Sequence, residues 1–225
     1  MTFLRWGGLS SLGVGVLVLA CGGGGDGGGM GPCVPGAATQ LVKTGGDAQS
    51  WYFNNPLPAS LGVTARDASG CAVPGVVVNW ALASGDGAVS PAQSTTNANG
   101  VAATADSVGS ASSQSVTATF SGLPTPLTFT ATASAPPTTA AVTVVNNGFN
   151  PDNVTIQVGG TVTWTWNSGG VEHNVTYNSP DVAAGRTNSA TQASGTHVNT
   201  ITTVGRFGYS CTIHAGMSGT VAVVH

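Results

Sequence analysis

Short runs in which apolar and polar residues alternate dominate this chain, and turn signals separate them about every ten residues. The runs occupy residues 61–65, 76–80, 101–104, 115–120, 127–132, 141–145, 154–158, 161–166, 199–202, 205–209 and 219–224. Alternation with a period of two is typical of β-strands, and the run at residues 76–80 predicts a buried strand. Because only 6% of the residues are charged, a coiled coil or helical bundle is excluded. The sequence therefore predicts an all-β protein.

The length of 225 residues suits two small domains, since one domain takes ~100–150 residues. Residues 134–139 contain Pro136 and Pro137, which stiffen the chain and prevent a strand from continuing. We interpret this segment as a linker between two β-sandwiches in tandem, at residues 33–133 and 140–225. We expect about seven strands in the first sandwich and roughly seven or eight in the second.

The charge balance excludes one class of partner. The chain has a net charge of −3 and only 5 Lys and Arg. Proteins that bind nucleic acids neutralise phosphates with many cations, so we expect no nucleic-acid partner.

The N-terminus has the pattern of an export signal. Arg5 precedes an apolar run at residues 9–20, which is shorter than the ~20 residues that cross a bilayer and fits a secretory signal. The run ends Val18-Leu19-Ala20-Cys21, which resembles a bacterial lipobox. The resemblance implies that residues 1–20 are a lipoprotein signal peptide and that Cys21 is lipidated. We expect an exported chain, anchored through this lipid to the periplasmic or cell-surface side of a bacterial membrane.

A Gly-rich stretch at residues 21–32 follows the signal. Such a composition cannot build a packed core. We interpret the stretch as a tether of roughly 18 Å root-mean-square length.

Four cysteines remain to be assigned. If Cys21 carries lipid, two of the other three are expected to pair outside the cytoplasm. Cys33 and Cys71 lie in the same half of the chain, whereas Cys211 lies in the other half, beside His214. We predict a disulfide between Cys33 and Cys71 and a free Cys211, whose thiol metal binding would explain.

The segment at residues 33–133 carries motifs of one known kind of domain, namely Gly46-Asp47-x-Gln49, Pro56-Leu-Pro58, Val63-x-Ala65-x-Asp67, Val73-Pro-Gly75-Val76, Val78-x-Trp80 and Thr96-x-x-x-Gly100. With these motifs it resembles the bacterial Ig-like domains of the invasin/intimin type. The resemblance implies an Ig-like sandwich that acts as a stalk or adhesion module. No grouping of catalytic residues occurs in the segment, and Trp51 and Tyr52 fit a half-buried edge strand better than a binding patch.

A thiol, an imidazole and a thioether lie close together in the second half, in the pattern Cys211-x-x-His214-x-x-Met217. Alternation in the preceding strand places Cys211 on the core side. A Cys, two His and a weak axial Met are the ligands of electron-transfer copper sites. His173 is the better candidate for the second His than His197, and neither His197 nor His225 has the context of a ligand.

The same half carries further matching motifs, namely Phe149-x-Pro151, Val158-Gly-Gly160, Val162-x-Trp164 and His173-Asn174-Val175. With them, residues 140–225 resemble the plastocyanin-like cupredoxins, with the short ligand loop of amicyanin. The resemblance implies a Greek-key sandwich with one type 1 copper ion, cycling between Cu(I) and Cu(II), on His173, Cys211, His214 and Met217. It also implies that Asn174 ties the loops of His173 and Cys211 together. Ala215 stands where amicyanins carry a proline.

These observations predict a membrane-anchored blue-copper protein that carries single electrons between redox partner proteins. A metal enclosed by protein ligands has no open position for a substrate, so we expect neither an enzyme nor a small-molecule substrate, and we expect a monomer. Three alternatives stay open: a copper-handling protein without a redox partner, an adhesin with an accessory copper domain, and a hydrolase that uses Cys211 and His214. A multicopper oxidase is disfavoured because no His-x-His pair occurs.

Overall fold

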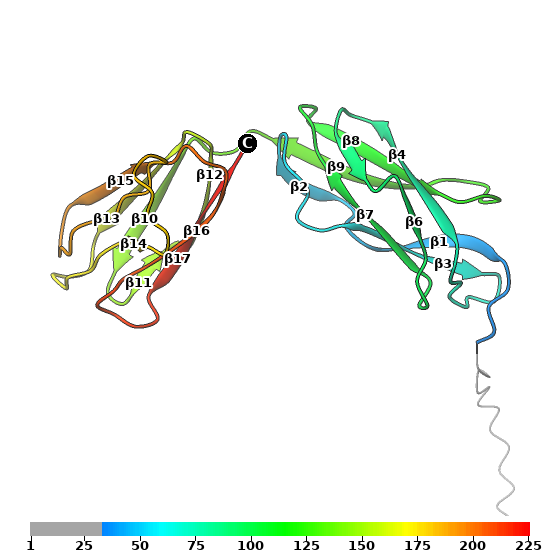
Figure 1. The fold of residues 1–225 in the computed structure, drawn as a ribbon, viewed down its shortest axis with the longest axis horizontal. Coiled ribbons are helices and arrows are strands. Elements are labelled where there is room, and N and C mark those ends of the chain that lie inside the picture. Colours follow the sequence, from blue (N-terminus) through cyan, green and yellow to red (C-terminus); the bar gives the residue numbers. More distant parts are fainter. Residues whose placement is uncertain (1–32) are drawn as a thin grey trace, which may run out of the picture. The chain divides into compact units, whose positions relative to one another are not determined.

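The computed structural model describes residues 33–225, and within this range the protein consists of strands and loops (Figure 1). The predicted signal peptide, the lipidated Cys21 and the Gly-rich tether lie outside the described residues. Strands alone form the regular structure of the described part, which confirms the all-β prediction. No helix long and apolar enough to cross a membrane is found between residues 33 and 225.

Residues 38–134 form two sheets. Their strands are β1 (Ala38–Gly45), β2 (Gln49–Tyr52), β3 (Leu61–Asp67), β4 (Val77–Ser84), β5 (Ala88–Ser90), β6 (Gln93–Thr95), β7 (Val101–Ser107), β8 (Ser113–Thr119) and β9 (Leu127–Ser134). One sheet has the order β1-β3-β7-β5 and the other β2-β9-β8-β4-β6. Both contribute side chains to one apolar core, which includes Val63 from the first sheet and Trp80 and Phe129 from the second.

Strand β4 of the first sandwich buries alternate residues at its start, which corrects one expectation. The run at residues 76–80 is not buried throughout: β4 begins at Val77, which is 49% exposed, while the next residue, Val78, is fully buried. One face of the sheet covers the core and the other faces solvent, so successive side chains point to opposite sides. Trp51 and Tyr52 lie half-buried on β2, an edge strand, as expected.

Residues 139–224 form two further sheets. Their strands are β10 (Thr139–Val145), β11 (Gly148–Asn150), β12 (Asn153–Gln157), β13 (Thr161–Trp166), β14 (Thr176–Tyr177), β15 (Thr196–Thr200), β16 (Gly205–Ser210) and β17 (Ser218–Val224). The sheet orders are β11-β10-β13-β15 and β12-β17-β16-β14. A second apolar core, with Trp164, Tyr209 and Ile156 fully buried, lies between them.

The cysteines of the described part fall into two classes. Cys33 and Cys71 are both disulfide-bonded, and Cys211 has a free, buried thiol. The chain beside Cys33 is also held by hydrogen bonds, because Gly36 N donates to Asp67 Oδ2 at 2.8 Å and Cys71 N donates to Asp67 Oδ1 at 2.9 Å. These bonds, that of Gly36 first, lower the pKa of Asp67.

Val77 and Val78 offer a matched test of this packing. We expect Val78→Ala to reduce the free energy of unfolding by about 2 kcal/mol, because it removes two buried methyl groups and leaves a cavity. We expect Val77→Ala to change it by only about 0.5 kcal/mol, because the side chain is half in solvent. Urea unfolding of the full chain measures both. Equal losses in the two variants would contradict the alternation.

Candidate metal centre

Strand pairing brings two distant segments of the chain to one end of the second sandwich. His173 and Asn174 lie just before β14, and Cys211 lies just after β16. These two strands pair antiparallel, with Thr176 opposite Ser210. In an antiparallel pair the start of one strand lies beside the end of the other. The fold therefore places His173 beside Cys211, although 38 residues separate them in the sequence.

Three potential ligand atoms converge at this end. Cys211 Sγ lies 3.8 Å from His173 Nδ1 and 3.6 Å from His214 Nδ1, and the ligand atoms of the three residues all lie within 4.8 Å of one another. Metal bonds of ~2.0 Å to imidazole nitrogen and ~2.3 Å to thiolate sulfur, at trigonal angles, separate ligand atoms by about 3.7 Å. The spacing of the three side chains therefore fits a single ion between them, and the set of one sulfur and two nitrogens suits copper.

The cluster is enclosed by protein. His173 is fully buried and Cys211 is 5% exposed, while His214 is partly exposed. Burial, and then the nearby imidazole of His214, lower the pKa of His173. A lowered pKa keeps this ring neutral, and a neutral imidazole has the free lone pair that a metal requires.

A short loop carries the two residues that follow Cys211. Cys211 N donates to Met217 O at 3.0 Å, which closes the loop between β16 and β17. Gly216 has a φ of +83°, a backbone conformation that glycine adopts without strain. Met217 is buried in the same apolar core as Cys211. The loop thus returns Met217 to the end of the sandwich where Cys211 lies.

Asn174 links the two ligand segments. Its Oδ1 accepts from Thr212 N at 2.9 Å, and its Nδ2 donates to Thr212 Oγ1 at 2.8 Å and to Thr191 Oγ1 at 3.0 Å. One buried side chain therefore holds the residue after His173 against the residue after Cys211. The pair of bonds to Thr212 fixes both the separation and the orientation of the two segments.

The backbone of His173 is held by residues that the sequence analysis missed. His173 N donates to Gln192 O at 2.9 Å and Gln192 N donates to His173 O at 3.0 Å. The same carbonyl accepts from Trp166 Nε1 at 3.1 Å. No signal in the sequence identifies Gln192, because it lies in a loop. Trp166 shows only the alternation of a strand residue.

The other histidine considered as a ligand lies elsewhere. His197 Nε2 bonds to Thr187 O at 2.8 Å, and its ring packs against Trp164 with centroids 5.9 Å apart. These contacts give His197 a structural role and leave His173 and His214 as the two histidines beside Cys211.

Residues 139–224 are similar in sequence to known copper-binding proteins. Residues 139–224 match a family described as copper binding proteins, plastocyanin/azurin family. The plastocyanin of Scenedesmus fuscus is 35% identical over 85 residues, covering 33% of this chain and 85% of the plastocyanin. Among solved structures, a purple cupredoxin from Nitrosopumilus maritimus is 27% identical, with a TM-score of 0.33, over 38% of this chain and 99% of that one. A reduced amicyanin variant is 26% identical, with a TM-score of 0.33, over 38% of this chain and 82% of that one.

Trp166 and Trp80 form a matched pair for testing the support of His173. Both indoles are buried and donate one hydrogen bond, Trp166 to His173 O and Trp80 to Ser94 Oγ. We expect Trp166→Phe and Trp80→Phe each to lower the stability of the chain, by about 1 kcal/mol for the lost hydrogen bond and more for the lost volume. Only Trp166→Phe is expected to shift the imidazole NMR signals of His173. A shift of the same size in both variants would exclude a positioning role for Trp166.

Proposed function

We propose, since the chain belongs through residues 139–224 to the plastocyanin/azurin family of copper-binding proteins, that it carries single electrons at one type 1 copper site. The ligands would be His173, Cys211, His214 and Met217. The observation that supports this assignment most strongly is the convergence of the Cys211 sulfur and two imidazole nitrogens, at 3.8 and 3.6 Å. Met217, which is buried in the same apolar core as Cys211, would supply a weak thioether ligand.

A bound copper ion supplies a one-electron couple between Cu(II) and Cu(I). The protein's part is to hold the ligands in nearly the same places for both states. Asn174 fastens the two ligand segments, and Gln192 and Trp166 hold the backbone of His173. Ligands held in this way move little when the charge at the site changes, which favours rapid electron exchange.

We propose that electrons enter and leave the site through His214. It is the partly exposed member of the cluster, and its neighbours Ile213, Ala215 and Gly216 are exposed and uncharged. We propose this surface as the place where a redox partner docks. An uncharged surface suits brief contacts, because steering by charge is weak there. The cluster is enclosed except at His214, which is partly exposed. This enclosure supports a carrier and not an enzyme.

The thiolate gives the proposed site a direct test. Copper loading of the full chain is expected to produce an intense visible band from charge transfer between the Cys211 sulfur and Cu(II), together with a narrow hyperfine splitting in the EPR spectrum. We expect Cys211→Ala to abolish the band. The double variant Cys33→Ala/Cys71→Ala is the control and is expected to keep it. A band that survives in Cys211→Ala would refute the assignment.

The role of the site is tested separately from its ligands. An electron carrier is expected to give a reversible one-electron wave in voltammetry, with equal peak currents for oxidation and reduction. A protein that only handles copper would instead release the ion to an acceptor protein when reduced. Release without a reversible wave would replace the proposed function by copper handling.

The rest of the chain is proposed to place this site outside the cytoplasm. The disulfide-bonded state of Cys33 and Cys71 supports an oxidising compartment. The first sandwich is proposed as an Ig-like spacer. Cys21 would carry the lipid. We expect Cys21→Ala to move the protein from the membrane to the soluble fraction of the exporting cell, because the lipid chains are lost. Retention of the variant in the membrane would argue against this anchor.

A further inference from the structure

We propose that a pocket beside β14 and β16 binds a small oxyanion, such as a phosphate or a carboxylate. The pocket has a volume of about 350 Å³ and is lined by residues 177–179 and 206–208 together with Arg186. It lies apart from the three clustered ligand side chains, none of which lines it. The inference does not depend on the proposed electron transfer.

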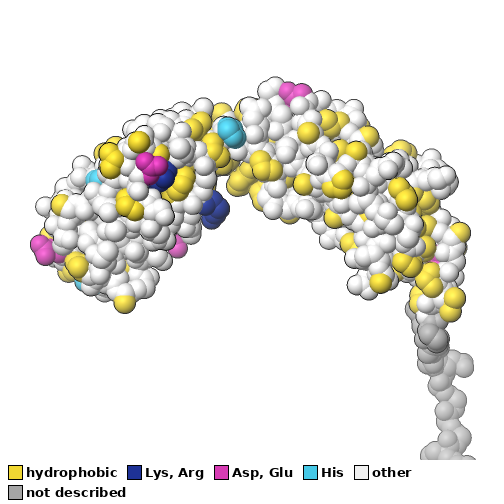
Figure 2. Space-filling model, viewed as in Figure 1, with side chains coloured by type: hydrophobic (Ala, Val, Ile, Leu, Met, Phe, Trp, Pro, Cys, Tyr) yellow, Lys and Arg dark blue, Asp and Glu magenta, His cyan; other side chains and the backbone are white. Residues whose placement is uncertain are grey.

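The two arginines of this half of the chain both line the pocket. Charged side chains are sparse over the face in Figure 2, and residues 139–225 contain only two cations, Arg186 and Arg206. Both line the same pocket. Asp181 offsets one of these two charges, so the pocket and its network keep one net positive charge for a ligand. Guanidinium groups are the preferred partners of phosphate and carboxylate oxygens.

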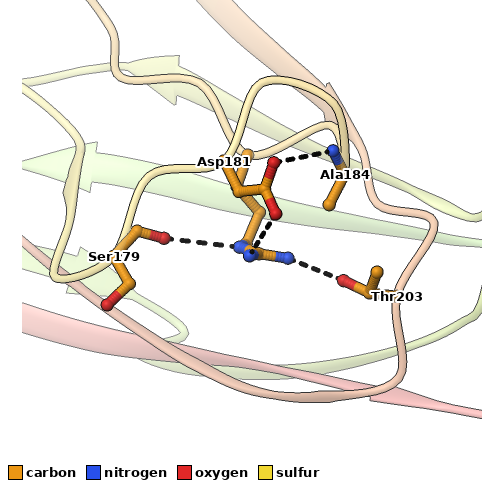
Figure 3. A network of polar contacts seen from close by, with 5 residues as sticks. Ser179, Asp181, Ala184 and Thr203 are labelled. Atoms are coloured by element: carbon orange, nitrogen blue, oxygen red, sulfur yellow. Dashed lines mark hydrogen bonds and ion pairs between the residues drawn. The ribbon is translucent and has the colours of Figure 1, made fainter.

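Arg186 is the fixed part of the site. Its side chain is buried, at 7% exposed for the residue, and its guanidinium group lies over the ring of Phe207, 4.0 Å from the centroid. Figure 3 shows Ser179, Asp181 and Thr203 around this group. It donates to Asp181 Oδ2 at 3.2 Å, to Thr203 Oγ1 at 2.6 Å and to Ser179 O at 3.5 Å.

These bonds leave Arg186 with spare donors. A guanidinium group has five N–H donors, and the three bonds use three of them. The two remaining donors are N–H groups of the Arg186 guanidinium, and Arg186 is buried and lines the pocket. A ligand oxygen in the pocket would accept from such a donor.

The loop around Arg186 is already formed. Asp181 and Arg186 exchange two backbone hydrogen bonds, of 3.0 and 2.8 Å, and Asp181 Oδ1 accepts from Ala184 N at 3.2 Å. Because these contacts hold the guanidinium group in place without a ligand, binding costs little ordering of the site.

Two further donors complete the pocket. Arg206 is exposed and takes part in neither of the ion pairs found among residues 33–225. Asn178 Nδ2 lies above Gly208, so close that a Cβ at that position would be 2.7 Å away. The absence of a side chain at Gly208 thus gives space to the Asn178 amide at the pocket wall. Because Arg206 and Asn178 line the same pocket as Arg186, a ligand there would have N–H donors from all three residues in the pocket wall.

The test is an NMR titration of the ¹⁵N-labelled full chain with sodium phosphate, sodium acetate or a triglutamate peptide, with sodium chloride at equal ionic strength as the reference. Saturable shifts of the Arg186 Nε–H and Asn178 side-chain signals are expected with at least one probe. Tightest binding of phosphate would identify a free anion as the ligand. Tightest binding of the peptide would identify the carboxylate of a partner protein.

Variants test whether anions bind at this pocket or are attracted to arginines anywhere on the protein. We expect Arg206→Gln to weaken binding by about fivefold and Asp181→Asn to strengthen it by a similar factor, because each changes one charge beside the ligand. Arg66→Gln removes the same charge in the first sandwich and is expected to have no effect. Shifts that do not saturate, or equal weakening by Arg206→Gln and Arg66→Gln, would overturn the proposal.

Discussion

The antiparallel pairing of β14 with β16 is the constraint on which the functional end of this protein depends. The ladder is short, with only Thr176 opposite Ser210 and Tyr177 opposite Tyr209. One further bond extends it, because Asn178 N donates to Gly208 O at 3.0 Å. The β14 segment is also held by the loop that follows it: Ser189 Oγ accepts from Val175 N at 2.8 Å, and Asn188 Oδ1 accepts from Tyr177 N at 3.0 Å. This register places His173 beside Cys211.

Two different sites, the candidate metal centre and the cationic pocket, lie along strand β16. Beyond the C-terminal end of β16 lies Cys211, in the enclosed cluster of candidate metal ligands. Toward its start, Arg206 and Phe207 face a pocket that gathers the positive charge of residues 139–225. Strand residues advance by ~3.3 Å each, so Gly208 and Cys211 lie about 10 Å apart along β16. The candidate metal centre and the cationic pocket therefore lie at different positions along the same strand.

The sequence predicts the parts of this arrangement that follow from local spacing. The alternation of residues 161–166 and 205–209 matches β13 and β16. The spacing of Cys211, His214 and Met217 predicts a ligand loop from the sequence alone. Strands of two or three residues, such as β14 and β11, are too short for a period to be visible. Support from Gln192, Thr191 and Trp166 could not be predicted, since it depends on how a loop lies across the His173 segment. The pairing of Arg186 with Phe207 and Thr203 likewise exists only in three dimensions.

The His173 ring is positioned without a hydrogen bond to its second nitrogen, Nε2. In many metal sites a hydrogen bond to the second ring nitrogen fixes the imidazole. Here Nε2 of His173 is buried without a partner. The residue is instead fixed through its backbone, by two bonds to Gln192 and one from Trp166, while Nδ1 points to Cys211 Sγ. With Nε2 carrying the proton, the lone pair of Nδ1 is directed into the cluster. The ring also packs against the His214 ring, with centroids 4.4 Å apart, so the strands, the loop and the second imidazole together set its orientation for a metal.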